Sequence, residues 1–179
     1  MHYNFTAFDE FEIFSSKQEV EQYREFKINE VQKNISFVKN HFDKKIDVLE
    51  IGSGNSKFLY GLEEIGLLNS GYGIDISKSR IDFANEWKSD LQIENVYNIQ
   101  GNVLELDMDG LPKFDLIYCV DMAFQLFDPA NQGSDIKILN SCYKKLKKGG
   151  KIVLELDNNK QILKSLHNNN IKLWQEFDN

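Results

Sequence analysis

The chain has 179 residues, of which 41% are hydrophobic and 27% are charged, and its formal net charge is −7. These values are typical of a soluble, one-domain globular protein, and the acidic balance argues against a general surface for nucleic acid or anionic membranes. The sequence has no long apolar run and no signal-type N-terminus, so we expect a cytoplasmic protein in which Cys119 and Cys142 are reduced and buried.

Residues 1–45 predict a helical unit ahead of the main domain, which we place at residues 46–179. Residues 1–14 are rich in aromatic side chains and are expected to pack on that domain. Ser16 and Glu19 have the spacing of a capping box. Apolar residues then follow helical spacing as far as Phe42, which predicts one long helix or two shorter ones.

A short apolar run from Ile46 to Ile51 predicts a buried parallel strand. The strand ends at residues 52–54, Gly-Ser-Gly, where the glycines allow a sharp turn and a close approach of a ligand to the backbone. Helical spacing follows from Phe58 to Ile65, and Gly66 is typical of a helix end. A strand, a glycine turn and a helix N-terminus in this order predict free N–H groups that point at a ligand.

The second predicted strand, Tyr72 to Ile76, carries a carboxylate, Asp75, near its end. Its distance from the glycine turn is close to the spacing of a carboxylate that accepts hydrogen bonds from ribose hydroxyls. Ser77 is expected to cap the next helix, whose apolar residues include Ile81, Ala84 and Trp87.

Three further strands are predicted at Val96–Gln100, 114–120 and 151–156, and the last follows a turn at residues 146–150. A helix is expected to begin at Ser134, with Ile136, Leu139, Cys142 and Leu146 at helical spacing. Strands that alternate with helices predict a parallel sheet covered on both faces. A ligand of such a sheet binds at the carboxyl ends of the strands.

The turn resembles the first motif of the class I S-adenosylmethionine-dependent methyltransferases, E/D-x-G-x-G-x-G, with Ser56 at the third glycine. Glu50 fits this motif because a carboxylate accepts hydrogen bonds from an ammonium group, whereas a pyrophosphate pocket would not favour it. The resemblance covers residues 46–157 and implies an α/β fold: a three-layer αβα, Rossmann-like, doubly wound sheet with an N-terminal helical cap. It also implies S-adenosylmethionine as cofactor, S-adenosylhomocysteine as product, and these cofactor-binding residues: Glu50, Gly52, Ser53, Gly54, Asp75, Ile76, Arg80, Asn102, Val103 and Cys119.

The resemblance also implies a role for each polar group near the cofactor. Asp75 would hold the ribose hydroxyls, and Ile76 would pack on adenine. Arg80 would lie across the adenine face, although a solvated arginine is an open alternative. Asn102 stands where the family has aspartate, and its side-chain oxygen can accept from the adenine amino group. The Val103 N–H would donate to a ring nitrogen.

Asp121 and Gln125 follow the fourth strand and would face the transferred methyl group. We expect Asp121 to remove a proton from the acceptor and Gln125 to orient it, with a helix cap as the alternative role of Asp121. The segment lacks the Asn/Asp-Pro-Pro-aromatic run of the amino-methylases of adenine and glutamine. We therefore expect a small-molecule oxygen or nitrogen acceptor and no nucleic acid partner.

Three alternatives to this interpretation stay open. An NAD-type oxidoreductase would need glycine where this chain has Lys57. A metal-assisted O-methyltransferase would bind Mg²⁺ through Asp121, Asp157 and Asn158. Because Asp121 lies about one residue off the pattern of catechol-type enzymes, we expect no metal. The third alternative is a subunit that binds S-adenosylmethionine without catalysis.

The C-terminal residues predict one helix, 158–168, and one strand, 171–177. The family usually closes its sheet with two strands, the last of which is inserted beside the fifth. We expect the chain to be a truncated form that lacks this C-terminal strand. An exposed sheet edge would then favour self-association.

Overall fold

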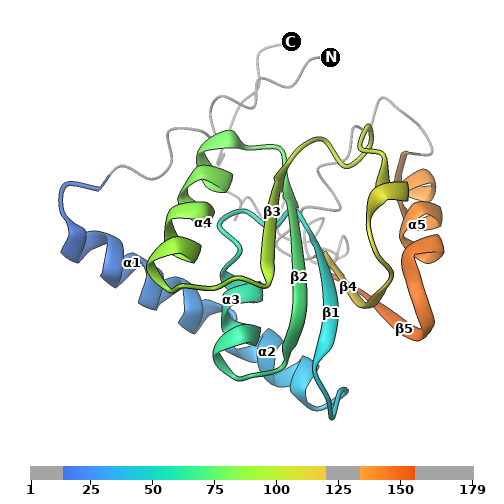
Figure 1. The fold of residues 1–179 in the computed structure, drawn as a ribbon, viewed down its shortest axis with the longest axis horizontal. Helices are drawn as coiled ribbons and strands as arrows, with labels where there is room; N and C mark the ends of the chain where they lie inside the picture. Colours follow the sequence, from blue (N-terminus) through green and yellow to red (C-terminus); the bar gives the residue numbers. More distant parts are fainter. Residues whose placement is uncertain (1–13, 120–133, 156–179) are drawn as a thin grey trace, which may run out of the picture.

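A computed structural model describes residues 14–119 and 134–155 (Figure 1). Within these residues the five strands form one sheet in the order β3-β2-β1-β4-β5, and all four pairings are parallel. The strands are β1 (Ile46–Ile51), β2 (Leu68–Asp75), β3 (Val96–Gln100), β4 (Phe114–Cys119) and β5 (Leu146–Leu154).

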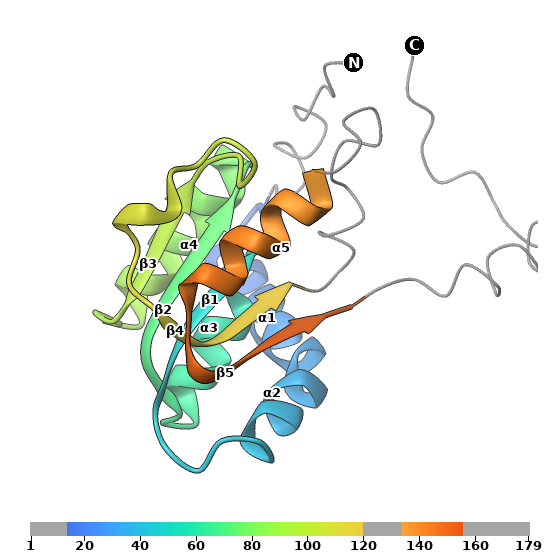
Figure 2. The same cartoon turned by 90° about the vertical axis from the view of Figure 1, so that its right-hand side faces the viewer.

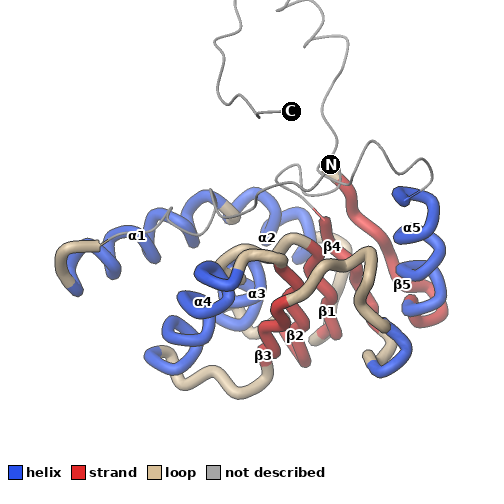
Figure 3. Tube along the Cα trace, turned by 90° about the horizontal axis from the view of Figure 1, so that it is seen from above, coloured by secondary structure: helices blue, strands red, loops and turns tan. Residues whose placement is uncertain are grey.

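Helices cover both faces of the sheet, which confirms the predicted αβα arrangement (Figure 3). Four helices lie on one face, whereas α5 lies on the other, beside β4 and β5 (Figure 2). The helices are α1 (Lys17–Glu30), α2 (Gln32–Lys39), α3 (Lys57–Glu64), α4 (Lys78–Asp90) and α5 (Ser134–Lys145), with a short 3₁₀ turn, η2 (Met108–Gly110). None of the helices in the described part of the chain is both long and apolar enough to cross a membrane.

Each face of the sheet has its own hydrophobic core. On the α1–α4 face, Val48 and Leu116 of the sheet pack with residues such as Phe58 of α3. On the α5 face, Leu49 and Ile117 pack with residues that include Cys142. Because successive side chains of a strand point to opposite faces, continuous apolar runs are needed where both faces are covered.

The predicted helix boundaries on the first face are confirmed. The Ser16 hydroxyl accepts from the Glu19 N–H at 3.3 Å and begins α1, while the Glu19 carboxylate accepts from the Ser15 N–H at 2.7 Å. The helical run is two helices, because Val31 ends α1 and precedes α2. At the end of α3, Gly66 adopts φ +71° and donates to the Glu63 carbonyl. This is the geometry of a glycine C-cap.

The predicted start of the second strand is wrong, because β2 begins at Leu68 instead of Tyr72.

Three further details of the prediction are wrong. In α5 the side chain of Ile136 is 61% exposed, and Ile138 is buried in its place. Ile65 caps the end of α3 and is also exposed. The fifth strand begins at Leu146 instead of residue 151, because Leu146 already pairs with Phe114 before the register shifts. The residues of the predicted turn, 146–150, lie within this strand, where Gly149 has φ +81°.

The predictions for residues 1–13 and for the C-terminal helix and strand lie outside the described residues. Phe14 is described and packs against Tyr23 and Phe83, with ring centroids 5.0 and 5.7 Å away. This contact agrees with the expected packing of the aromatic N-terminal segment, for its last residue alone.

A charged network joins β1, β4 and β5 at the amino ends of the strands. The ammonium of Lys147 lies 2.7 Å from the Asp115 carboxylate and 2.5 Å from that of Asp47. Asp47 also accepts from Ser70 and Asn69. Burial alone would raise the pKa of Asp47, but the hydrogen bonds from Lys147, Ser70 and Asn69 outweigh burial and lower that pKa below its usual 3.8. Lys147 therefore stabilises two partly buried carboxylates at once.

Replacing Lys147 by methionine should lower the free energy of unfolding by about 1–2 kcal/mol at neutral pH. Because the pKa of Asp47 is held below 3.8, this stabilisation is present above that pH and is lost as the pH falls through the lowered pKa. Urea unfolding at neutral pH and at about pH 3 measures the difference. The control is Lys148→Met on the neighbouring, exposed lysine. An equal loss of unfolding free energy in Lys148→Met would contradict the stabilising role of Lys147. A loss in Lys147→Met that is the same at both pH values would also contradict it.

Candidate functional site

The glycine turn lies at the carboxyl end of β1 and folds against β2. The N–H groups of Gly52 and Ser53 both donate to the Ile74 carbonyl, at 2.8 and 3.1 Å, and the Ser56 N–H donates to the Ser53 carbonyl. The expectation of free N–H groups is wrong for these residues. Buried backbone donors need partners, and this turn finds them in β2 and within itself.

Asp75 is brought next to the turn, as predicted. One carboxylate oxygen accepts from the Gly54 N–H at 2.7 Å, and the other accepts from the Ser77 N–H at 2.9 Å. The carboxylate thus links the turn to the start of α4, where the Ser77 hydroxyl accepts from the Arg80 N–H. Each carboxylate oxygen has a second lone pair, so Asp75 retains the capacity to accept from a ligand.

Arg80 and Ile76 follow Asp75 in the sequence, and Arg80 lies beside the same turn. A Cβ atom built on Gly54 would lie 3.4 Å from Nη1 of Arg80, so the guanidinium is close to the turn. Ile76 leaves 38% of its surface exposed immediately after β2. Arg80 therefore places a planar cation beside the turn, and Ile76 offers exposed apolar surface directly after Asp75.

Glu50 lies beneath the turn, on the face of the sheet that α3 covers. It is only 4% exposed and is aligned with Gly73 of β2 and Tyr118 of β4. The ring of Tyr118 stacks on Phe58 of α3, with centroids 3.9 Å apart. Next to Glu50 in the turn, the buried hydroxyl of Ser53 has no hydrogen-bond partner within residues 14–119 and 134–155. The end of β1 and the turn therefore provide a buried carboxylate, from Glu50, and a buried hydroxyl, from Ser53.

Asn102 and Val103 follow β3 and are joined to the same edge of the sheet, because the Gly101 N–H donates to the Asp75 carbonyl at 2.8 Å. The Asn102 side-chain oxygen accepts from the Leu104 N–H at 3.0 Å, so part of its acceptor capacity serves the local turn. Val103 packs at the edge of the core on the α5 face.

The remaining predicted site residues lie farther along the chain. Cys119 ends β4 and is 1% exposed, in the core on the α5 face. Asp121 and Gln125 lie outside the described residues, as do Asp157 and Asn158 of the metal alternative. Within the described ranges, no group of three or more potential ligands from His, Cys, Asp and Glu is placed to hold a metal ion.

Three residues around the turn were not predicted as part of the site: Tyr23, Asn55 and Gly73. Asn55 donates to the Tyr23 hydroxyl at 3.2 Å, which ties α1 to the turn. Gly73 leaves room for the turn above β2, since an added Cβ would lie 2.8 Å from the Ser53 hydroxyl. A glycine inside a strand indicates that another segment approaches the backbone closely, so the sequence alone could have indicated the role of Gly73.

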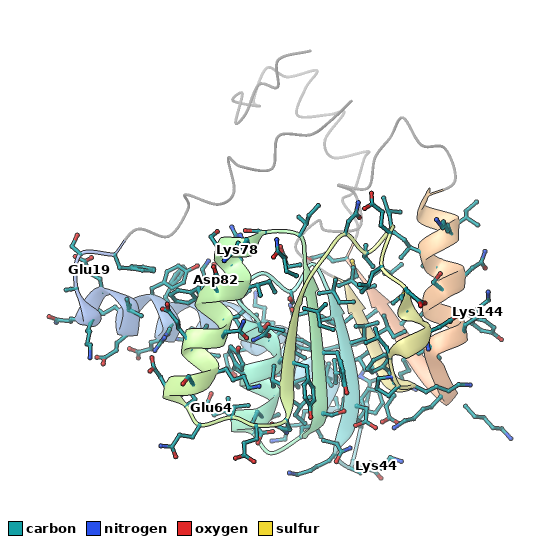
Figure 4. The ribbon with its side chains drawn as sticks, turned by 45° about the horizontal axis from the view of Figure 1, so that its top comes forward. Glu19, Lys44, Glu64, Lys78, Asp82 and Lys144 are labelled. Carbon is teal, nitrogen blue, oxygen red and sulfur yellow. The ribbon has the colours of Figure 1, made fainter. Side chains whose placement is uncertain are left out.

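A surface cavity of about 890 Å³ lies away from the turn. Residues of α1, the end of α3 and the end of α4 line it, including Arg24, Glu64 and Leu91. Figure 4 places Glu64 at the opposite end of the helical layer from Lys78 and Asp82, which lie near the carboxyl ends of the strands. The cavity is therefore separate from the site that Asp75 and the turn define.

Comparison with known families gives one match, to the family described as "Methyltransferase domain", over residues 42–178. A comparison with curated proteins finds no match.

Several solved structures share the fold. PH0226 from Pyrococcus horikoshii OT3 is 22% identical with a TM-score of 0.64, over 93% of this chain and 71% of that one. CalS10, an amino pentose methyltransferase from Micromonospora echinaspora with SAM bound, is 14% identical with a TM-score of 0.58, over 80% of this chain and 57% of that one. PKMT2 from Rickettsia typhi, in complex with AdoHcy, is 28% identical with a TM-score of 0.51, over 62% of this chain and 20% of that one. The chain spans less than half of the length of several matched proteins.

Replacing Gly73 by alanine should lower the free energy of unfolding by about 1–3 kcal/mol, because the new methyl group overlaps the turn. An added Cβ would lie 2.9 Å from the Ser56 hydroxyl as well as 2.8 Å from that of Ser53. The control is Gly110→Ala, since a Cβ at Gly110 meets nothing within 4 Å. Urea unfolding of both variants provides the measurement. Equal stability of the two variants would show that the turn does not need the space above Gly73.

Proposed function

The chain belongs to the methyltransferase domain family, and we propose that it transfers a methyl group from S-adenosylmethionine to an oxygen or nitrogen atom of a small molecule. The observation that carries this proposal is the contact between the glycine turn and Asp75, in which the Gly54 N–H donates to the carboxylate at 2.7 Å. This contact brings a glycine turn and a carboxylate to the edge of the sheet where α/β proteins bind nucleosides, and we propose that the carboxylate accepts from the ribose.

The residues present fit S-adenosylmethionine. Glu50 is a buried carboxylate suited to the ammonium of the methionine part, and the buried Ser53 hydroxyl has bonding capacity left for it. Asp75 would accept from the ribose hydroxyls. Ile76 offers exposed apolar surface for adenine, with Arg80 close to the turn.

Two further positions complete the proposed cofactor site. Asn102 and Val103 would bind the polar edge of adenine, since they follow the strand next to Asp75. Cys119 would border the site from the end of β4. The structures of CalS10 with SAM bound and PKMT2 with AdoHcy support this choice of cofactor.

S-adenosylmethionine, when bound, supplies a methyl group activated by a sulfonium, which an acceptor atom attacks in line. The main task of the chain's residues is then to hold the acceptor against that group and aligned with it. Asp121, two residues after β4, would take the proton of a hydroxyl or ammonium acceptor, and Gln125 would orient the acceptor.

A small acceptor is favoured by the charge of the chain. The formal net charge of −7 gives no general attraction for nucleic acid, whose binding requires neutralisation of phosphates. CalS10, which shares the fold, is described as an amino pentose methyltransferase. An amino sugar therefore belongs in the first panel of acceptors.

Titration calorimetry should show binding of S-adenosylmethionine and S-adenosylhomocysteine and no binding of NAD. Asp75→Ala should weaken S-adenosylmethionine binding by about 1.5–3 kcal/mol, the range for hydrogen bonds to a charged group. The control is Asp82→Ala, which removes an exposed carboxylate of α4 that pairs with Lys78 (Figure 4). Heat from NAD alone would refute the proposal, and unchanged affinity in Asp75→Ala would refute the role of that residue.

Methyl transfer should continue in the presence of EDTA, because Asp121 lies about one residue off the sequence pattern of the magnesium-dependent, catechol-type enzymes. Release of S-adenosylhomocysteine over a panel of amino and hydroxyl acceptors measures this. Activity that is lost in EDTA and restored by Mg²⁺ would contradict metal-independent transfer and would favour a metal-assisted O-methyltransferase.

A further inference from the structure

Ser56 holds an unusual backbone conformation at the start of α3. It is the N-cap residue, with φ 59° and ψ 24°, and its side chain does not cap the helix. The left-handed region costs a residue other than glycine about 1–2 kcal/mol. Ser56 is completely buried, so hydrogen bonds to water do not compensate for the cost of the left-handed conformation.

The Ser56 hydroxyl donates to the side-chain oxygen of Asn98 in β3, at 2.7 Å. This contact spans an entire strand, because β2 lies between β1 and β3 in the sheet. It is possible because Gly73 is the residue of β2 that pairs with Asn98. A Cβ at Gly73 would lie 2.9 Å from the Ser56 hydroxyl, in the space that the contact uses.

The orientation of the Asn98 amide is fixed by its other neighbours. Its nitrogen donates to the Tyr60 hydroxyl at 3.1 Å and to the Asn85 side-chain oxygen at 3.0 Å. The Tyr60 hydroxyl in turn donates to the Ala84 carbonyl at 2.6 Å. With both amide hydrogens used, only the oxygen of Asn98 is left to face Ser56.

Tyr60 keeps its proton under all ordinary conditions. Burial is the main cause, and together with the negative charge of Glu50 it raises the pKa of Tyr60 to about 12, against the lowering effect of the Asn98 hydrogen bond. The Tyr60 hydroxyl therefore remains a donor to the Ala84 carbonyl, and donation runs from Ser56 through Asn98 and Tyr60 to Ala84.

We infer that Asn98 is a positioning residue that holds Ser56 in the left-handed conformation and thereby sets the shape of the glycine turn. The inference rests on the proposed function, since the turn would bind the methionine part of the cofactor. Asn98 lies two residues before the end of β3, which leads to Asn102. It therefore connects the two ends of the proposed cofactor site, the turn and the adenine edge.

A double-mutant cycle tests this inference, because glycine adopts the left-handed conformation without help. Asn98→Ala should weaken S-adenosylmethionine binding by about five- to tenfold, the equivalent of one hydrogen bond. In the Ser56→Gly background, the same substitution should change the dissociation constant by less than about twofold. Asn95→Ala is the matched control and should bind as the unaltered protein does, because Asn95 precedes β3 at its other end and donates to Glu63 and not to the turn.

A second measurement does not depend on the cofactor. The Ser56 N–H donates to the Ser53 carbonyl at 2.8 Å, so its hydrogen exchange reports on the turn in the ligand-free protein. Asn98→Ala should speed this exchange about five- to tenfold, and should leave the exchange of residue 56 unchanged when that residue is glycine.

Equal effects of Asn98→Ala in both backgrounds would overturn the inference, as would no effect in the first. If the unaltered protein does not bind S-adenosylmethionine, the proposed function fails, and hydrogen exchange alone then decides the role of Asn98.

Discussion

The hydrogen bond from the Gly54 N–H to the Asp75 carboxylate is the contact on which the rest of the site depends. It holds the turn after β1 against the end of β2, and the second carboxylate oxygen binds the Ser77 N–H at the start of α4. One side chain thus fixes a turn, a strand end and a helix start. A partly buried, charge-assisted bond of this kind is stronger than a neutral one.

The two ends of the sheet use charge differently. At the amino ends, Lys147 is placed between Asp47 and Asp115, so a cation of the protein itself pairs with both carboxylates. At the carboxyl ends, the carboxylates of Glu50 and Asp75 lie beside the turn, in the place where an open α/β sheet binds its ligand. The ion pairs at the amino ends stabilise the fold. At the carboxyl ends, the carboxylates beside the turn are placed to accept hydrogen bonds from a ligand.

Local signals predicted most of the fold. The bounds of β1 and β3, the cap at Ser16 and the glycine at the end of α3 each depend on a few adjacent residues, and each is found as expected. The partners of the turn's N–H groups could not be predicted, because they depend on the register that places Ile74 beside the turn. The contact between Ser56 and Asn98 likewise requires knowledge of two strand pairings at once.

The space above Gly73 has a consequence for how this site is able to change through evolution. Ser56, Gly73 and Asn98 share one small volume, so their substitutions are not independent. A side chain at position 73 is crowded by Ser56 as well as by Ser53 for as long as Ser56 reaches across β2. If serine is first exchanged for glycine, Asn98 is released from its role and position 73 gains room on one side. The stability of an evolutionary intermediate therefore depends on the order in which positions 56, 73 and 98 are substituted, and not only on which substitutions are made.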